Sequence, residues 1–416
     1  MRVRNVRQGI LTANNSCLCI EDYRGGDNVN ILMLSKSYSP YVHNGRDRHV
    51  VELSQHIAGK GISVHIVTPN GGQFENAYNQ EYELLDGVHV HRPRAKLSSE
   101  YYKLNLHHHN YSLFECSLAL GQQRKFDLIH AHDVEVGIAA LFLKRVLELP
   151  LCVTVHYLYE MNNYAYESQF EKWILPECDN IITVSHWMRE QIMRLYPDTK
   201  NITVIPNGIN LSTFSPGRPE IEALPHADNR KVILYVGRLS PEKGLDVLMR
   251  SVARIITQED RLHLVVVGTG KDQFYYDMCM ELGLAKHVTF LGFVNDEAIL
   301  RSIYRQADVV VVPSVFEAFG LVALEAMACG APTIVTDVGG LPDVVVNNSC
   351  GLVVPARDEQ AIIDAILLVI NNQNVADRFR SNGLERVKRF GWADVSSRTV
   401  DLYAAQLSKR QARPNS

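Results

Sequence analysis

The 416-residue chain lacks several features that would place it in a specialised class of protein. No stretch approaches the roughly 18 consecutive apolar residues of a membrane-spanning helix, and no apolar run long enough for a signal peptide follows Arg2, Arg4 and Arg7. The net charge of −4 gives no basic footprint for nucleic acid. We therefore expect a cytoplasmic protein that neither crosses a membrane nor binds nucleic acid.

Patterns typical of metal sites are missing as well. The eight cysteines are scattered without a CxxC pair, and some lie in apolar runs such as LCVTV at residues 151–155. This distribution is typical of reduced, buried thiols in a cytosolic protein. No pair of aspartates of the DxD type follows a strand in the second half of the chain. We therefore expect no metal and no other cofactor.

The chain has the composition of a large globular protein with two domains. Its residues are 46% hydrophobic and 21% charged, and its length exceeds what one core usually serves. Short β-branched runs alternate with amphipathic stretches: residues 30–38 predict a strand, 49–61 a helix and 63–69 a second strand. Such a βαβ unit belongs to a parallel sheet. Further strands are expected at 126–132, 151–156, 180–185, 231–239, 262–268, 287–292, 307–314 and 332–337.

A polar loop at about 212–230 divides the strands into two series, which predicts an α/β fold of two Rossmann-like domains whose parallel sheets face each other across a cleft. The aromatic final stretch predicts a helix that crosses back to the first domain, although packing on the second domain alone is equally compatible. The expected divisions are an extension of unknown role at 1–28, a first domain at 29–211, a second at 212–389 and the last helix at 390–416.

Two carboxylates lie in the otherwise apolar stretch SVFEAFGLVALEAMACG, residues 314–330. A helix beginning near Phe319 puts Glu317 in the preceding turn and Glu325 in the second helical turn. The backbone amides of 319–321 would point into the cleft and suit a phosphate, whereas the carboxylates suit neutral hydroxyls such as those of a sugar. The alternative is that Glu317 only favours the helix N-terminus and that Glu325 is a solvated helix residue.

Two cations follow a neighbouring strand. GRLSPEKG, residues 237–244, places Arg238 and Lys243 in one loop at the cleft, where a forked guanidinium and a compact ammonium suit a diphosphate. In the first domain, Gly45 within residues 39–50 allows close approach of the backbone to a ligand. A solvated surface loop is the alternative for residues 237–244, and the motif at Gly45 is weak alone because glycine turns before helices are common.

These residues together resemble the retaining glycosyltransferases of the GT-B fold, family four, also described as glycosyltransferases group 1. The resemblance covers about residues 30–405 and rests on the combination of EAFGLVALEAMACG, GRLSPEKG, IPNGIN, HAHD and the late aromatic helix. It implies a hexosyltransferase that uses a nucleotide diphosphate sugar as donor and a sugar, glycoside or lipid-linked acceptor. Transfer with retention, by front-face attack and without a metal, is also implied.

The resemblance implies a role for each matching residue. Arg238 and Lys243 would hold the donor diphosphate, and Glu325 would bind the ribose hydroxyls. Glu317 would contact the transferred sugar, and His132 would lie near its anomeric centre. Further donor-binding positions are implied at Gly45, Phe319, Gly320, Leu321, Gly339 and Gly340.

The chain departs from the family pattern at two positions and leaves alternatives open. Asn44 precedes Gly45 where the family often has a second glycine, and Asp343 stands where it often has glutamate. A non-hydrolysing sugar-nucleotide epimerase of the same architecture, or an inactive nucleotide-sugar-binding protein, remain alternatives. Residues 92–111 interleave basic and aromatic side chains; we expect a solvated loop rather than a peripheral membrane contact there. The sequence does not identify the donor base, the acceptor or the oligomeric state.

Overall fold

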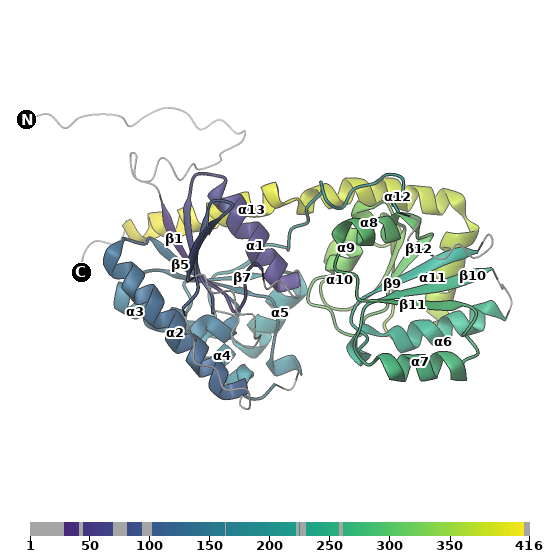
Figure 1. Cartoon of the computed structure of the whole chain (residues 1–416), viewed down its shortest axis with the longest axis horizontal. Helices are drawn as coiled ribbons and strands as arrows, with labels where there is room; N and C mark the ends of the chain where they lie inside the picture. The colour runs from purple at the N-terminus through teal and green to yellow at the C-terminus, as the bar shows by residue number, and fades with distance from the viewer. Residues whose placement is uncertain are drawn as a thin grey trace, which may run out of the picture.

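The computed structural model of the chain describes residues 29–40, 45–69, 81–93, 102–162, 164–221, 224, 230–257 and 261–411. Two α/β domains lie side by side, each built around one sheet (Figure 1). The strand order reverses at the centre of each sheet, where β1 lies between β2 and β5 and where β9 lies between β10 and β12. Ligands of such folds bind beside the carboxyl ends of the strands at this switch point.

The first sheet has the order β3-β4-β2-β1-β5-β6-β7-β8 and is parallel except for an antiparallel hairpin at one edge. The hairpin turns at Asp86-Gly87, both with positive φ, a pair typical of tight turns. The hairpin was not among the predicted strands. The strands are β1 (Asn30–Leu34), β2 (Ser63–Val67), β3 (Tyr82–Leu85), β4 (Val88–His91), β5 (Leu128–His132), β6 (Leu151–Val155), β7 (Asn180–Thr183) and β8 (Ile202–Val204).

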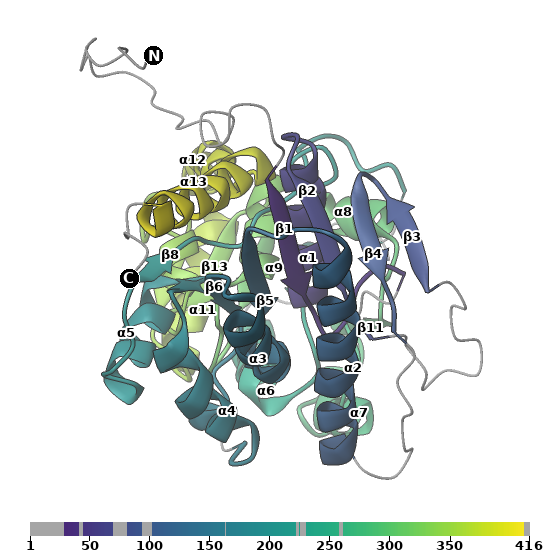
Figure 2. The same ribbon diagram turned by 90° about the vertical axis from the view of Figure 1, so that its left-hand side faces the viewer.

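Helices of the first domain cover both faces of this sheet, and one of them corrects an expectation. Residues 102–111 were expected in a solvated loop but begin α2, which lies beside α3 (Figure 2). Asn110 is buried there, and its side-chain amide donates to the carbonyl oxygens of Leu106 and Glu135 at 2.9 and 2.7 Å. The helices are α1 (Gly45–Ala58), α2 (Tyr102–Gln123), α3 (Gly137–Leu147), α4 (Glu167–Ile174) and α5 (His186–Leu195), with 3₁₀ turns at Val134–Val136, Glu160–Asn162 and Leu175–Glu177.

The second sheet is parallel throughout, in the order β11-β10-β9-β12-β13-β14. The expected fold class, two Rossmann-like domains, is therefore confirmed. The strands are β9 (Lys231–Val236), β10 (Leu262–Val267), β11 (Val288–Gly292), β12 (Val309–Val312), β13 (Thr333–Thr336) and β14 (Leu352–Val354). The helices are α6 (Leu245–Ile256), α7 (Asp272–Glu281), α8 (Glu297–Gln306), α9 (Leu321–Ala328), α10 (Leu341–Val344), α11 (Glu359–Asn371) and α12 (Gln373–Val387), with 3₁₀ turns at Pro241–Lys243 and Lys388–Phe390.

The last helix, α13 (Trp392–Gln411), returns to the first domain and lies along α1. In Figure 1 it continues the yellow band that α12 begins over the second domain. The Tyr403 hydroxyl lies 2.5 Å from Nδ1 of His130, and Trp392 is buried with its ring 5.3 Å from that of His49. A side chain at Gly208 would lie 2.4 Å from the Trp392 ring, so glycine is needed at this crossing. Of the two placements that the sequence allowed, the helix adopts the one on the first domain.

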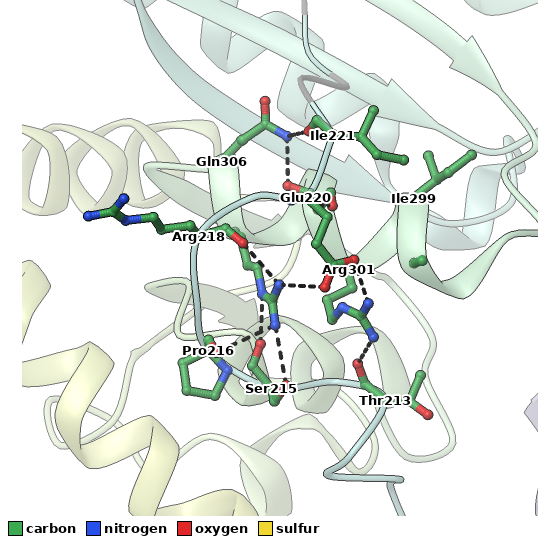
Figure 3. Close-up of polar contacts among 12 residues, drawn as sticks. Thr213, Ser215, Pro216, Arg218, Glu220, Ile221, Ile299, Arg301 and Gln306 are labelled. Atoms are coloured by element: carbon green, nitrogen blue, oxygen red, sulfur yellow. Dashed lines mark hydrogen bonds and ion pairs between the residues drawn. The ribbon is translucent and has the colours of Figure 1, made fainter.

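The linker between the domains is bound to the second domain by α8 (Figure 3). Arg301 donates to the carbonyl oxygen of Thr213 at 2.7 Å, and Gln306 donates to that of Ile221 at 3.1 Å. The carboxylate of Glu220 pairs with Arg301 and with Arg305. These contacts fix residues 213–221 to the second domain, so any relative motion of the domains has to occur before Thr213 on this crossing.

The sequence predicted no membrane-spanning helix and reduced, buried cysteines, and both points can be compared with the described residues. Within them, no helix combines the length and apolar character needed to cross a bilayer. The six cysteines in this part of the chain are all free thiols, and five of them are buried. Cys116 is half-buried.

Candidate active site

A cavity of about 400 Å³ lies where the two domains meet, and both domains supply its walls. The first domain contributes residues that follow β6, and the second contributes two loops that follow β9 and β12. The lining residues are His156, Tyr157, Tyr164, Arg238, Glu242, Lys243, Phe316, Glu317 and Ala318.

The two second-domain loops meet because β9 and β12 are neighbours in the sheet. Gly244 makes their close approach possible: it has a φ of +68°, and a Cβ there would lie 1.9 Å from the carbonyl oxygen of Pro313. The amide of Val315 donates to the carbonyl oxygen of Glu242 at 2.8 Å. Segments about 70 residues apart in the sequence thereby form one wall of the cavity.

This wall carries the two predicted cations, each beside a carboxylate. Nζ of Lys243 lies 2.7 Å from Oε2 of Glu317, and both side chains are mostly buried. Arg238 is 70% exposed and lies 3.2 Å from Glu242. Arg238, Lys243 and Glu317, three of the predicted catalytic residues, therefore line one cavity. The positive charge is accessible at Arg238 and already neutralised at Lys243.

The loop after β13 supports the backbone that carries Glu317. Gly339 has a φ of +57°, and a Cβ there would lie 1.7 Å from the carbonyl oxygen of Glu317. The amide of Gly340 donates to that same oxygen at 3.0 Å. Both glycines thus position the main chain of Glu317 and are not among the residues that line the cavity.

The N-terminus of α9 follows directly. Gly320, with a φ of +114°, caps the helix, and its carbonyl accepts from the amide of Leu324 at 3.2 Å. The first backbone amides of a helix have no acceptor within the helix, so the amides of α9 that begin at Leu321 can donate to other groups. The side chain of Phe319 is buried, with its ring 6.0 Å from that of Phe390.

Glu325 is buried within the second domain and already has two partners. The Tyr304 hydroxyl donates to it at 2.9 Å, and Arg48 of α1 lies 3.3 Å from its other oxygen. Burial raises the pKa of Glu325, while the charge of Arg48 lowers it. A solvated helix residue, the alternative reading of this position, is therefore excluded. Arg48 also pairs with Glu297 at 3.4 Å, so it joins the two domains.

The two domains also meet at Gly45, a predicted donor-binding residue, and at Asp343, which departs from the family pattern. Gly45 begins α1, and a Cβ there would lie 2.4 Å from Cδ1 of Leu321. Asp343 accepts from the backbone amide of His186 at 2.6 Å, so the shorter acid found in this chain serves an interdomain contact. Asn44, the other departure from the family pattern, lies outside the described residues.

His132 ends β5 and is buried behind the cavity rather than exposed in it. Its ring centroid lies 5.9 Å from that of His156, which does line the cavity, and 5.9 Å from that of His49. Burial lowers the pKa of His132 and His156 well below the usual range and that of His49 to about 3. All three rings are therefore neutral near pH 7.

A buried network of charges beside His156 was missed at the sequence level. Arg46 lies 2.7 Å from Glu135 and 3.2 Å from Asp133, and Asp133 accepts from the backbone amide of His156 at 3.1 Å. Burial raises the pKa of Asp133 to about 6 despite Arg46. Burial opposes ionisation of Glu135 too, but Arg46 and Lys36 hold its pKa at about 2. The available signal was the charges in HNGRDRHV and HAHDVEV, which follow the neighbouring strands β1 and β5.

An aromatic wall was also missed. Phe316 of the second domain inserts between two rings of the first, at 6.0 Å from Tyr157 and 5.6 Å from Trp187. Tyr164 lies 6.2 Å from Tyr157 and extends this wall. The signal for it was the tyrosine-rich segment HYLYEMNNYAY after β6.

Comparisons with known proteins identify the family. The model of Glycosyltransferase Family 4 matches residues 43–213, and that of Glycosyl transferases group 1 matches residues 218–386. An uncharacterized glycosyltransferase of Methanocaldococcus jannaschii is 30% identical over 90% of this chain and 98% of its own length. The chain belongs to the group 1 glycosyltransferases of the GT-B fold. The predicted family is thereby confirmed.

Two further matches give this glycosyltransferase a context. The glycogen synthase of Mycobacterium tuberculosis is 29% identical over 93% of this chain and 97% of its own. The structure of sucrose-phosphate synthase from Thermosynechococcus elongatus superposes with a TM-score of 0.80 at 26% identity, covering 92% of this chain and all of that one. Together with the family match, these relatives support a glycosyltransferase that uses a nucleotide-sugar donor, and the epimerase alternative is not favoured.

Proposed function

We propose that this glycosyltransferase transfers a hexosyl residue from a nucleoside diphosphate sugar to an acceptor hydroxyl, with retention of the anomeric configuration and without a metal ion. The observation that carries the proposal is the meeting of Arg238, Lys243 and Glu317 in one interdomain cavity. A hexosyl group is supported by the relatives named for glycogen and sucrose phosphate, both of which contain hexoses.

The two cations are proposed to stabilise the leaving diphosphate. Negative charge grows on the phosphate as the bond to C1 of the sugar breaks, and fixed positive charge there lowers the barrier. Lys243 is held in place by Glu317, whereas the exposed Arg238 can fold over the phosphate. We expect these two cations to take the place of a metal ion at the diphosphate, which requires each to share its carboxylate partner with the phosphate oxygens.

Glu317 is proposed to accept hydrogen bonds from hydroxyls of the transferred sugar while it orients Lys243. We do not assign it as a nucleophile, because its carboxylate is paired with Lys243 beside the proposed phosphate position. In the front-face path, a leaving phosphate oxygen takes the proton of the acceptor hydroxyl as that hydroxyl attacks C1. Detection of a glycosyl-Glu317 adduct by mass spectrometry would overturn this assignment.

The remaining donor contacts follow from the same arrangement. Glu325 is proposed to bind the ribose hydroxyls, which requires Arg48 to share or release the carboxylate. The amides at Phe319, Gly320 and Leu321 are proposed to face the phosphate or sugar, with Gly45 opposite. Gly339 and Gly340 act through the main chain of Glu317, and His132 is proposed to act at the sugar through the adjoining His156.

The test is an assay of the purified protein with UDP-, GDP- and ADP-hexoses, with and without a mixed pool of sugar and glycoside acceptors. We expect acceptor-dependent release of nucleoside diphosphate from one donor, unaffected by EDTA and lost in Lys243→Ala. NMR of the product should show the anomeric configuration of the donor. An inverted product would refute retention, loss of activity with EDTA would refute metal independence, and an altered sugar without release would refute the transferase.

A further inference from the structure

Three histidines from separate elements converge behind the cavity. His49 comes from α1, His132 ends β5, and His156 follows β6. Each can offer one ring nitrogen so that the three nitrogens lie within 4.8 Å of one another, and all three side chains are buried. The triad adjoins the cavity, because His156 also lines it.

Five of the six ring nitrogens of this triad lack a hydrogen-bond partner in the part of the chain that the structure describes. Among the described residues, neither nitrogen of His49 or His132 has a hydrogen-bond partner, and nor does Nε2 of His156. The amide oxygen of Asn207 lies near His49 but makes no hydrogen bond of normal geometry with it. A buried polar atom without a partner costs about 1–3 kcal/mol, so several in one place favour the binding of a ligand there.

His130 shows that this environment can satisfy an imidazole. It is fully buried, with its ring centroid 4.2 Å from that of His132. Its Nδ1 lies 2.5 Å from the Tyr403 hydroxyl and its Nε2 lies 2.7 Å from Oγ1 of Thr154. Within this cluster, the unsatisfied nitrogens therefore lie on the three rings that face one another and not on His130.

The ligand must accept electron pairs from neutral imidazoles. Zinc is bound by histidine nitrogens at about 2.0–2.1 Å, which places tetrahedral ligand atoms about 3.4 Å apart. Ligand atoms at most 4.8 Å apart therefore have to close by up to about 1.4 Å. The nearby positive charge of Arg46 is balanced by Asp133 and Glu135, so it does not by itself exclude a cation.

We propose that His49, His132 and His156 form a binding site for one divalent transition-metal ion of the zinc type. Three histidines leave the fourth position of a tetrahedral ion open. Because an ion would engage the rings of His132 and His156, it would inhibit sugar transfer rather than assist it. The inhibition rests on the proposed function, whereas the binding does not.

Binding can be measured on the metal-free full-length protein without turnover. Equilibrium dialysis against Zn²⁺ should give one tightly bound ion per chain, and Co²⁺ as a probe should develop a visible absorption band that Zn²⁺ abolishes. Both signals should disappear in His49→Gln. They should persist in the matched control His89→Gln, a histidine of the same domain that stacks on His65 and bonds to Tyr82 instead.

Metal binding that is equal in His49→Gln and wild type would overturn the site and assign the signal to other histidines. Absence of the Co²⁺ band in wild type would overturn it as well. Thermal unfolding of each variant checks the fold, and if His49→Gln does not fold, His156→Gln replaces it in the binding measurements only. With an active donor in hand, Zn²⁺ should inhibit wild type and His89→Gln reversibly on addition of EDTA, and should not inhibit His49→Gln. Zn²⁺ that binds the triad without slowing transfer would refute the inhibition alone.

Discussion

The two walls of the cavity differ in how they hold their functional groups. The second-domain wall consists of two loops with paired charges, Arg238 with Glu242 and Lys243 with Glu317, close enough to solvent for a ligand to reach. The first-domain wall is backed by buried neutral histidines and the buried network around Arg46. An exposed charge such as that of Arg238 needs little support, whereas a buried polar group is costly without partners, and the mostly buried Lys243 has one in Glu317. The second wall therefore presents charged side chains to the cavity, and the first presents aromatic rings and the neutral imidazole of His156.

The largest effect that this contrast predicts is that of Lys243→Ala. Removing a fixed cation from the leaving group should lower kcat on the order of 100-fold or more. Steady-state nucleoside diphosphate release measures it, and Lys286→Ala, an exposed lysine of the same domain, is the control. A loss no greater than that of the control would show that the second wall does not supply the charge.

Substitution of a glycine should cost more stability in the second domain, at Gly339, than in the first, at Gly45. Gly339→Ala places a Cβ against the backbone oxygen of Glu317 in a left-handed conformation, which should destabilise the fold by about 1–3 kcal/mol and reduce activity. Gly45→Ala meets only the rotatable end of Leu321 and should cost less. Urea unfolding of both variants decides this comparison. A larger loss for Gly45→Ala would mean that the first wall is the more rigid one.

Glu325→Gln tests whether the buried acid binds the donor. Glutamine keeps an acceptor for Tyr304 but loses the charge, and one hydrogen bond to a charged group is worth about 1.5 kcal/mol, or roughly 10-fold. We expect the donor KM to rise by about that factor with little change in kcat. Glu297→Gln, which removes the other partner of Arg48, should leave KM within about a factor of two. Equal effects in the two variants would assign the role to Arg48 instead.

Acid should destabilise the first domain more than the second. Near neutral pH this is the smallest of the four predicted effects. Burial lowers the pKa of His65 to about 3 and that of His91 to about 4. Below the unfolded value near 6.5, the unfolded chain binds more protons than the folded one, so stability falls as the pH decreases toward these values.

Tryptophan fluorescence suits this measurement, because Trp173, Trp187 and Trp392 all lie in the first domain or pack on it. Urea midpoints should fall between pH 7 and pH 5, and less steeply in His65→Gln than in wild type. The same pH dependence in both proteins would show that other groups cause the loss.

The sequence determined the fold class and pointed to the two second-domain loops that meet in the cavity. Apolar periodicities of 2 and 3.6 residues report locally which face of an element is buried, so ten of the strands were predicted before the structure. The loops at 237–244 and 314–320 could also be recognised from the sequence, because each carries its glycines and charges in one short segment. The four strands that were not predicted are β3, β4, β8 and β14, each of only three or four residues.

Only the tertiary structure decided the rest. Arg48 reaches Glu325 across 277 positions, and the triad of His49, His132 and His156 comes from three separate elements. In the helix that residues 102–111 begin, Leu106 and Asn110 are buried against the rest of the first domain. This burial stabilises the helix although the neighbouring residues are polar. Local pattern sets which face of an element is buried, but strand order and the approach of the two domains set which buried side chains meet.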